Sequence, residues 1–312
     1  MSATALPLVG APRRRRIRWR QQIVGYLFIG PWISGILIFI AGPMIASFAL
    51  AFTNYNVIQP PEFVGLANIQ RLLGDPRIAT ALYNTAYYTF LGVPAQLTVA
   101  LAMAVLLNQR VRFTNFFRSA FYVPTVAPAV AMIYLWVWMF NYDFGLINGL
   151  LRMVGLAPVQ WLWDPAIAKP AIILFSLTRT GSEMIIFLAA LQGVPDELHE
   201  SAAIDGATAW NKFRFVTLPM ISPLIFLNLV LGIIGSFQVF TVAFIATHGG
   251  PVDATLFFVL YLYHHGFENL QMGYASTMAW LLFIVIMVIT FIQFRVANRW
   301  VYYESAEPGR VR

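Results

Sequence analysis

The sequence predicts an all-α integral membrane protein with six transmembrane helices. Apolar residues make up 59% of the 312 residues and charged residues 11%, whereas soluble domains average roughly 45–50% and 25%. Six apolar runs reach the roughly 20 residues that a helix needs to cross a bilayer. Cationic residues gather in alternate connections between these runs. Together these observations predict one membrane domain over 23–294, with basic tails at 1–22 and 295–312.

The first apolar run, Ile23–Phe52, follows a tail with six arginines. It is too long for the apolar core of a signal peptide, and we find no convincing small-residue cleavage site before it, so it predicts an uncleaved span. Pro31 or Gly42-Pro43 is expected to bend it. Pro124 and Pro128 are expected to interrupt the third span. Spans two to six are predicted at Tyr83–Leu107, Ser119–Phe140, Pro170–Gln192, Pro223–Ala246 and Met272–Phe294.

The connections alternate in charge. Fifteen of the twenty Lys and Arg residues fall in the two tails and in the second and fourth connections, four fall in the other connections, and Arg179 lies within a span. Positive charge marks the cytoplasmic side, so both termini are predicted to be cytoplasmic. The same distribution makes the charge a topology signal and argues against nucleic-acid binding. The predicted external connections are Asn54–Leu82, Asn141–Lys169 with a short helix at Leu146–Val154, and Thr247–Gln271.

The cytoplasmic connection at 193–222 has the pattern of a folded element. Pro195 followed by two acidic residues is typical of a helix start. Gly206 permits a break, and Thr208–Thr217 predicts a second short helix that ends before Leu218-Pro219. We expect Asp205 or Glu200 to cap or orient the first helix. One face of that helix is small at its centre, so another surface can approach it closely; its residues are Leu198, Ser201, Ala202 and Asp205.

The residues Glu200-Ser201-Ala202-Ala203-Ile204-Asp205-Gly206-Ala207, followed by Phe213 and Leu218-Pro219, resemble the EAA loop of permease subunits in bacterial ATP-binding-cassette (ABC) importers. The flanking Val194-Pro195-Asp196-Glu197-Leu198 and Thr217-Leu218-Pro219 resemble its carbohydrate branch, which includes the maltose and glycerol-3-phosphate permeases. Ser201 stands where the family usually has its first alanine. The resemblance covers about 23–294 and implies a type I importer permease fold, with residues 193–222 forming a coupling loop that docks on the ATPase. The coupling residues that it implies are Glu200, Ser201, Ala202, Ala203, Asp205, Gly206 and Ala207.

Two charged residues, Arg179 and Glu183, lie one helical turn apart in the fourth span. Charge at that depth is costly and usually faces a bundle interior or a wet cavity, so the two residues either form a structural ion pair or line a transport path. The resemblance implies sugar contacts on the spans before and after the coupling loop. The matching positions include Phe175 on the earlier span and Val239 on the later one. The substrate path that it implies consists of Thr178, Arg179, Ser182, Glu183, Gly232, Ser236 and Gln238. The maltose site is richer in asparagine and has a tyrosine, which points here to a charged or smaller ligand or to no tight site. Gly232 and Gly235 also suit close helix packing.

The motifs that the sequence lacks indicate that ATP hydrolysis belongs to another subunit. The chain has no Gly-x-x-x-x-Gly-Lys-Ser/Thr loop and so is not expected to be the ATPase. His264-His265 lacks a third metal ligand and instead predicts an aromatic cluster with Tyr261 and Tyr263. The resemblance implies a non-enzymatic sugar-importing subunit of the bacterial plasma (inner) membrane, with ATP and Mg²⁺ held by an ATPase dimer. The other implied partners are a second permease subunit, usually in a heterodimer, and an extracytoplasmic sugar-binding protein. An ion-coupled secondary transporter and a membrane enzyme using Arg179 and Glu183 are the alternatives.

Overall fold

The structure is a computed structural model that describes residues 19–109 and 112–302, with side chains described at all of these except 20–22. Most of both predicted tails lies outside these residues. The chain divides into two compact units, 1–49 and 50–312. Within the described residues the fold is helical, apart from a two-residue antiparallel pairing of β1 (Thr53–Asn54) with β2 (Glu62–Phe63).

The N-terminal unit contains the first span, which is helical. The second half of this span has no buried residues. The span consists of α1 (Trp19–Ile36), a π-helical turn η1 (Leu37–Ala41) and α2 (Gly42–Leu50). The wide turn immediately precedes Pro43, which has no N–H for a regular helical hydrogen bond. The predicted irregularity near Gly42-Pro43 is therefore present as a π-helical turn.

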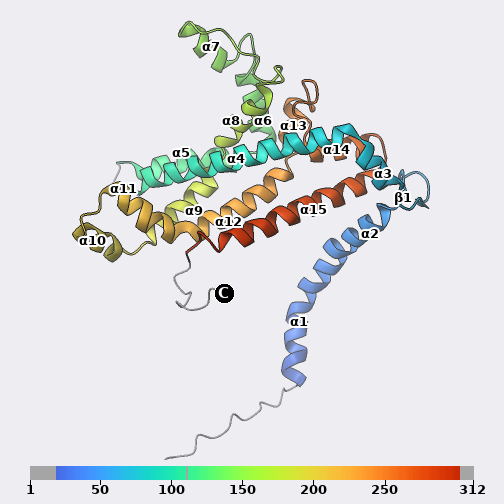
Figure 1. Ribbon diagram of the computed structural model, residues 1–312, viewed down its shortest axis with the longest axis horizontal. Coiled ribbons are helices and arrows are strands. Elements are labelled where there is room, and N and C mark those ends of the chain that lie inside the picture. Colours follow the sequence, from blue (N-terminus) through green and yellow to red (C-terminus); the bar gives the residue numbers. More distant parts are fainter. Residues whose placement is uncertain (1–18, 110–111, 303–312) are drawn as a thin grey trace, which may run out of the picture. The chain divides into compact units, whose positions relative to one another are not determined.

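Four stretches of helix in the described residues are long and apolar enough to cross a membrane, and two bent helix pairs bring the number of spans to six. The four are Ile23–Leu50, α4 (Pro76–Asn108), the stretch Ala209–Phe237 and α15 (Met272–Ala297). Figure 1 shows α4, α12 (Leu218–Phe237) and α15 running side by side in the second unit. The central α4 also packs against both helices of the fourth span, so it is the axis of the core.

The third and fourth spans are each broken into two helices. In the third, α5 (Thr114–Val126) and α6 (Ala129–Met139) meet at 98°. Pro128 precedes α6 and holds Ala127 in an extended conformation, which ends α5. In the fourth, α8 (Ala168–Leu177) and α9 (Gly181–Gln192) meet at 47°. The interruption predicted for the third span is confirmed at Pro128, whereas Pro124 lies inside α5. The break in the fourth span, predicted as one helix over Pro170–Gln192, was missed.

The backbone break in the fourth span is stabilised by hydroxyl side chains. Thr178 Oγ1 donates to the carbonyl of Phe175 at 2.7 Å, and Thr180 Oγ1 donates to that of Leu177 at 3.1 Å. The Phe175 carbonyl also accepts from the Thr178 N–H at 3.1 Å, so the hydroxyls add hydrogen bonds to carbonyls at the end of α8. Beyond the break, a Cβ on Gly181 would overlap the α5 backbone at Phe121 and Tyr122, so only glycine permits this close approach.

The predicted boundaries of two other spans are also wrong. Helix α4 begins at Pro76 rather than Tyr83, because Asp75 accepts a hydrogen bond from the Arg77 N–H at 3.0 Å and proline suits the first helical position. The fifth span runs unbroken from α11 (Ala209–Lys212) through the π-helical turn η2 (Phe213–Thr217) into α12. The short helix predicted at Thr208–Thr217 therefore does not end before Leu218-Pro219, and the fifth span does not start at Pro223.

A local hydrogen bond explains why the prolines do not break the fifth span. Pro223 lacks the N–H that would bond to the carbonyl of Pro219, and Ser222 Oγ donates to that carbonyl at 2.6 Å instead. The span ends at Phe237, and a separate short helix, α13 (Thr241–Ala246), follows.

The connections predicted to be external contain folded elements. They are α3 (Ala67–Gly74), α7 (Leu146–Met153), α14 (Phe258–Tyr263) and the π-helical turn η3 (His264–Glu268). The short helix predicted at Leu146–Val154 is confirmed as α7, which Figure 1 shows in green at the tip of its segment. Asn148 on α7 is fully buried and bonds to Asn141, Tyr142, Val159 and Trp161.

Asp75 joins the start of α4 to α14 and α15. Its carboxylate accepts hydrogen bonds from the hydroxyls of Tyr261 at 2.6 Å and Tyr274 at 3.0 Å. Burial raises the pKa of Asp75, but these bonds, together with the Arg77 N–H, lower it by more, so the net shift is downward. The predicted aromatic cluster around the histidine pair is confirmed, with the His265 ring 4.7 Å from that of Tyr261 and the His264 ring 6.4 Å from that of Tyr263.

Candidate functional site

The coupling loop, residues 193–222, contains an exposed nine-residue helix, α10 (Asp196–Ile204). Pro195 precedes it in an extended conformation, and Asp196 and Glu197 occupy its first turn, where acidic groups suit the helix dipole. Figure 1 shows α10 beyond the ends of α9 and α12. No residue of α10 is buried, so little internal packing holds it in place.

Gly206 ends α10 as predicted, in a left-handed conformation with φ of 77°. The Gly206 N–H donates to the Ala203 carbonyl at 3.0 Å, and the Ala207 N–H donates to the Ala202 carbonyl at 2.9 Å. This pair of bonds is the Schellman arrangement, in which a left-handed residue satisfies the last carbonyls of a helix. No side chain caps the N-terminus of α10. The side-chain cap in this loop belongs to the next helix, where Thr208 Oγ1 accepts from the Asn211 N–H at 3.3 Å.

Apolar side chains are exposed on and beside α10. The exposed fractions are 87% for Ile204, 64% for Trp210 and 67% for Phe215. Ile204 ends the exposed α10, and Trp210 and Phe215 lie in the first turns of the fifth span. Exposed apolar side chains of this size are typical of a contact surface. Of the predicted coupling residues, Ala202 and Ala207 are half-buried, and the exposed members are Glu200, Ser201, Ala203, Asp205 and Gly206.

A pocket of about 340 Å³ opens where the breaks in the fourth and fifth spans meet. The break at Thr178–Thr180 contributes Arg179, and the break after Phe237 contributes Gln238 and Val239. Irregular backbone at membrane depth is tolerated where it lines a cavity. The lining residues are Tyr88, Gln96, Ala129, Ile133, Phe175, Ser176, Arg179, Gln238, Val239, Phe240, Thr241 and Val242.

Arg179 is the one charged side chain among these lining residues, all of which the structure describes. Its Nη2 lies 3.5 Å from the carbonyl of Thr125. The ion pair weighed for Arg179 and Glu183 is absent: within the described residues, ion pairs join Arg77 to Asp253 and His264 to Glu268. The bend separates the two side chains, since Arg179 precedes α9 and Glu183 lies in its first turn.

The pocket contains only part of the predicted substrate path. Arg179 and Gln238 line it, together with Phe175 and Val239. The predicted residues that do not line it are Thr178, Ser182, Glu183, Gly232 and Ser236. A Cβ on Gly232 would lie 2.9 Å from Val93 Cγ1, so this glycine allows α12 to pack closely against α4. One Glu183 carboxylate oxygen is buried without a hydrogen-bond partner in the described part of the chain.

The sequence reasoning missed the contribution of α4. Tyr88 and Gln96 lie eight residues apart, close to two helical turns, and therefore on one face. Polar side chains sharing a face of an apolar span are the signal that would have identified them. Thr241 and Phe240 were missed because the predicted fifth span continued through them as a regular helix.

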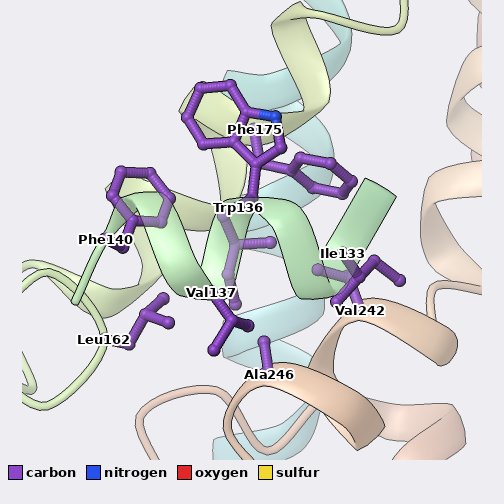
Figure 2. A pocket seen from close by; sticks show the side chains of 9 residues that line it. Ile133, Trp136, Val137, Phe140, Leu162, Phe175, Val242 and Ala246 are labelled. Carbon is purple, nitrogen blue, oxygen red and sulfur yellow. The ribbon is translucent and has the colours of Figure 1, made fainter. Parts of the chain in front are cut away.

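A second, smaller pocket shares part of its wall with the first. Figure 2 shows Ile133, Phe175 and Val242, which line both pockets, together with Trp136. The surface of this smaller pocket is entirely apolar, and its volume of about 10 Å³ is barely the space of one water molecule. The Trp136 and Phe175 rings lie 5.8 Å apart in an edge-on arrangement. This cluster orients Phe175 and does not form a ligand site of its own.

The fold and the coupling loop define a membrane-embedded transport subunit. Residues 96–302 match the family described as "Binding-protein-dependent transport system inner membrane component", and the chain belongs to this family. It is 40% identical over 300 residues to the probable ABC transporter permease protein YesP of Bacillus subtilis, covering 95% of this chain and 96% of that protein. It is 34% identical to the lactose transport system permease protein LacF of Rhizobium radiobacter, over 91% of this chain and 97% of that one.

A solved structure supports the same fold. The bacterial alginate ABC transporter, in complex with an alginate pentasaccharide-bound periplasmic protein, contains a chain with a TM-score of 0.79 and 24% identity, covering 90% of this chain and 96% of that one. The predicted six-span importer permease fold is thereby confirmed. The chain is a multi-pass membrane protein and a non-catalytic ABC permease, with ATP hydrolysis assigned to a separate subunit.

Proposed function

We propose that this chain carries a sugar or sugar derivative across the bacterial inner membrane, from a binding protein outside to the cytoplasm. The observation that carries the proposal is the 340 Å³ pocket between broken spans, with tyrosine, glutamine, serine and threonine side chains in its wall. Its size falls in the roughly 300–1,000 Å³ range of small-molecule sites. The relatives LacF, the trehalose/maltose permease MalF of Thermococcus litoralis and the arabinooligosaccharide permease AraP of Bacillus subtilis support a carbohydrate.

We further propose that the coupling loop docks on an ATPase dimer, which alone binds ATP and Mg²⁺. The exposed apolar residues Ile204, Trp210 and Phe215 are suited to a groove in a protein partner. The loop joins α9 of the fourth span to the fifth span, and the helix breaks in these two spans contribute residues to the pocket wall. Movement of the loop would therefore reach the pocket through two helices. A second permease subunit completes the cavity, and both termini are cytoplasmic.

The test uses the complete transporter in proteoliposomes, with the binding protein outside and ATP inside. Sugar uptake is expected to require ATP and to continue when ionophores collapse ion gradients. Uptake that needs an ion gradient and proceeds without the ATPase would instead identify a secondary transporter. Chemical conversion of the sugar by the permease would identify an enzyme.

A further inference from the structure

The pocket contains a cation without an acidic partner. Arg179 is its one charged lining residue, and none of the described carboxylates forms an ion pair with it. The nearest hydrogen-bond acceptor is the Thr125 carbonyl, at the long distance of 3.5 Å. A guanidinium has five N–H donors in a planar fork, so most of its donor capacity is available to whatever enters the pocket. An unneutralised charge within a membrane span is costly and usually serves a function.

A second cation lies at the other end of α8. Lys169 is in the first turn of α8 and Arg179 follows the last turn, so the length of this ten-residue helix, about 15 Å, separates their backbones. Its Nζ donates to Asn84 Oδ1 at 2.8 Å and lies 5.0 Å from the Tyr83 ring centre and 5.2 Å from that of Tyr87. These distances are within the range of cation–π attraction. The adjacent Tyr88 lines the pocket itself.

Lys169 and Arg179 therefore lie at opposite ends of α8, Arg179 in the pocket wall and Lys169 outside it beside α4. The aromatic rings beside them offer apolar faces for sugar rings, while the cations favour negative charge. A neutral sugar would leave the Arg179 charge uncompensated, whereas a carboxylate or phosphate can accept two parallel N–H bonds from it.

We propose that the transported sugar is anionic, bearing a carboxylate or a phosphate that Arg179 binds in the pocket. Lys169 attracts the same group at the other end of α8. This inference rests on the proposed function and adds the chemical class of its substrate.

The experiment compares matched anionic and neutral sugars in the reconstituted transporter. The first pair is oligogalacturonides and the same oligosaccharides after carboxyl reduction, which converts each carboxylate into a neutral hydroxymethyl group. The second pair is glucose 6-phosphate and glucose, so the two pairs distinguish a carboxylate from a phosphate. The wild-type protein is expected to take up the anionic member of one pair at least tenfold faster than its neutral counterpart.

Three variants connect the preference to the pocket. Arg179→Gln is expected to lose the anionic preference, and Arg179→Lys to retain part of it because the charge remains. Arg299→Gln is the matched control, since Arg299 is exposed at the last turn after α15, outside the pocket. Assembly of each complex is checked by size-exclusion chromatography before uptake is compared.

The outcomes separate this inference from the proposed function. Wild-type uptake of neutral sugars in preference to anionic ones would overturn the inference and leave sugar transport standing. An anionic preference that survives in Arg179→Gln would also overturn it. If no sugar, neutral or anionic, enters the vesicles, both the inference and the proposed function are refuted.

Discussion

Replacing Gly206 with valine perturbs the coupling loop through its backbone alone. A Cβ at this position meets no atom within 4 Å, and the φ of 77° lies where β-branched residues are strongly disfavoured. The left-handed conformation costs an L-residue roughly 1–2 kcal/mol. Because α10 has no buried residues, little packing opposes a rearrangement, and we expect the native loop population to fall about 5–30-fold relative to alternatives.

The assay is sugar uptake per ATP hydrolysed in the reconstituted transporter, which we expect Gly206→Val to lower about 5–30-fold if that population sets coupling. Gly206→Asn should stay near the wild-type value, because asparagine tolerates this conformation. Gly155, in a connection predicted to be external, provides a matched control: its φ is 78°, its Cβ position is also open, and its N–H donates to the Arg152 carbonyl at 3.1 Å. A normal ratio in a stably assembled Gly206→Val complex, or an equal loss in Gly155→Val, would refute the reasoning.

Three further predictions concern stability. Asn148→Ala leaves buried hydrogen-bonding groups unpaired, at about 1–3 kcal/mol each, and should speed proteolysis of the external segment around α7 at least fivefold; an unchanged rate would contradict this. Asp75→Asn should lower the Tm at pH 7, and the difference from wild type should shrink as the pH falls below about 4, because a carboxylate with a lowered pKa stabilises the fold above its unfolded pKa and loses this effect as it protonates. A difference in Tm that stays the same at low pH would contradict this. Gly232→Ala should destabilise the protein by about 1–3 kcal/mol through its contact with Val93, and adding Val93→Ala should restore the Tm; failure of the double variant to recover would show that the contact is not the cause.

The sequence predicted the membrane class, the number of spans and the coupling helix, because these depend on local signals. Apolar length fixes a span, and Pro195 and Gly206 delimit α10 through backbone preferences that need no tertiary contact. The start of α15 at Met272 was also predicted correctly. The start of α4 was missed because Asp75-Pro76, which falls within the predicted connection Asn54–Leu82, caps and begins the helix.

The pocket could be predicted only in part, because it forms from helix breaks. Threonines around Arg179 can continue a helix or bond to its carbonyls, and the sequence does not distinguish these choices. The helical spacing of Arg179 and Glu183 therefore suggested an ion pair that the bend prevents. The contribution of α4 depends on which of its faces meets α6 and α8, which is decided by tertiary packing.

Cross-linking between the coupling loop and the ATPase tests the central claim most directly. The chain has no cysteine, so a single Ala203→Cys variant carries one reactive thiol at an exposed position of α10. Leu156→Cys, exposed beside α7, serves as the matched control. With a short bifunctional maleimide and cysteine-containing ATPase variants, we expect Ala203→Cys to cross-link to the ATPase and Leu156→Cys not to do so. Absence of a cross-link from Ala203→Cys in a complex that hydrolyses ATP and imports sugar would contradict the account.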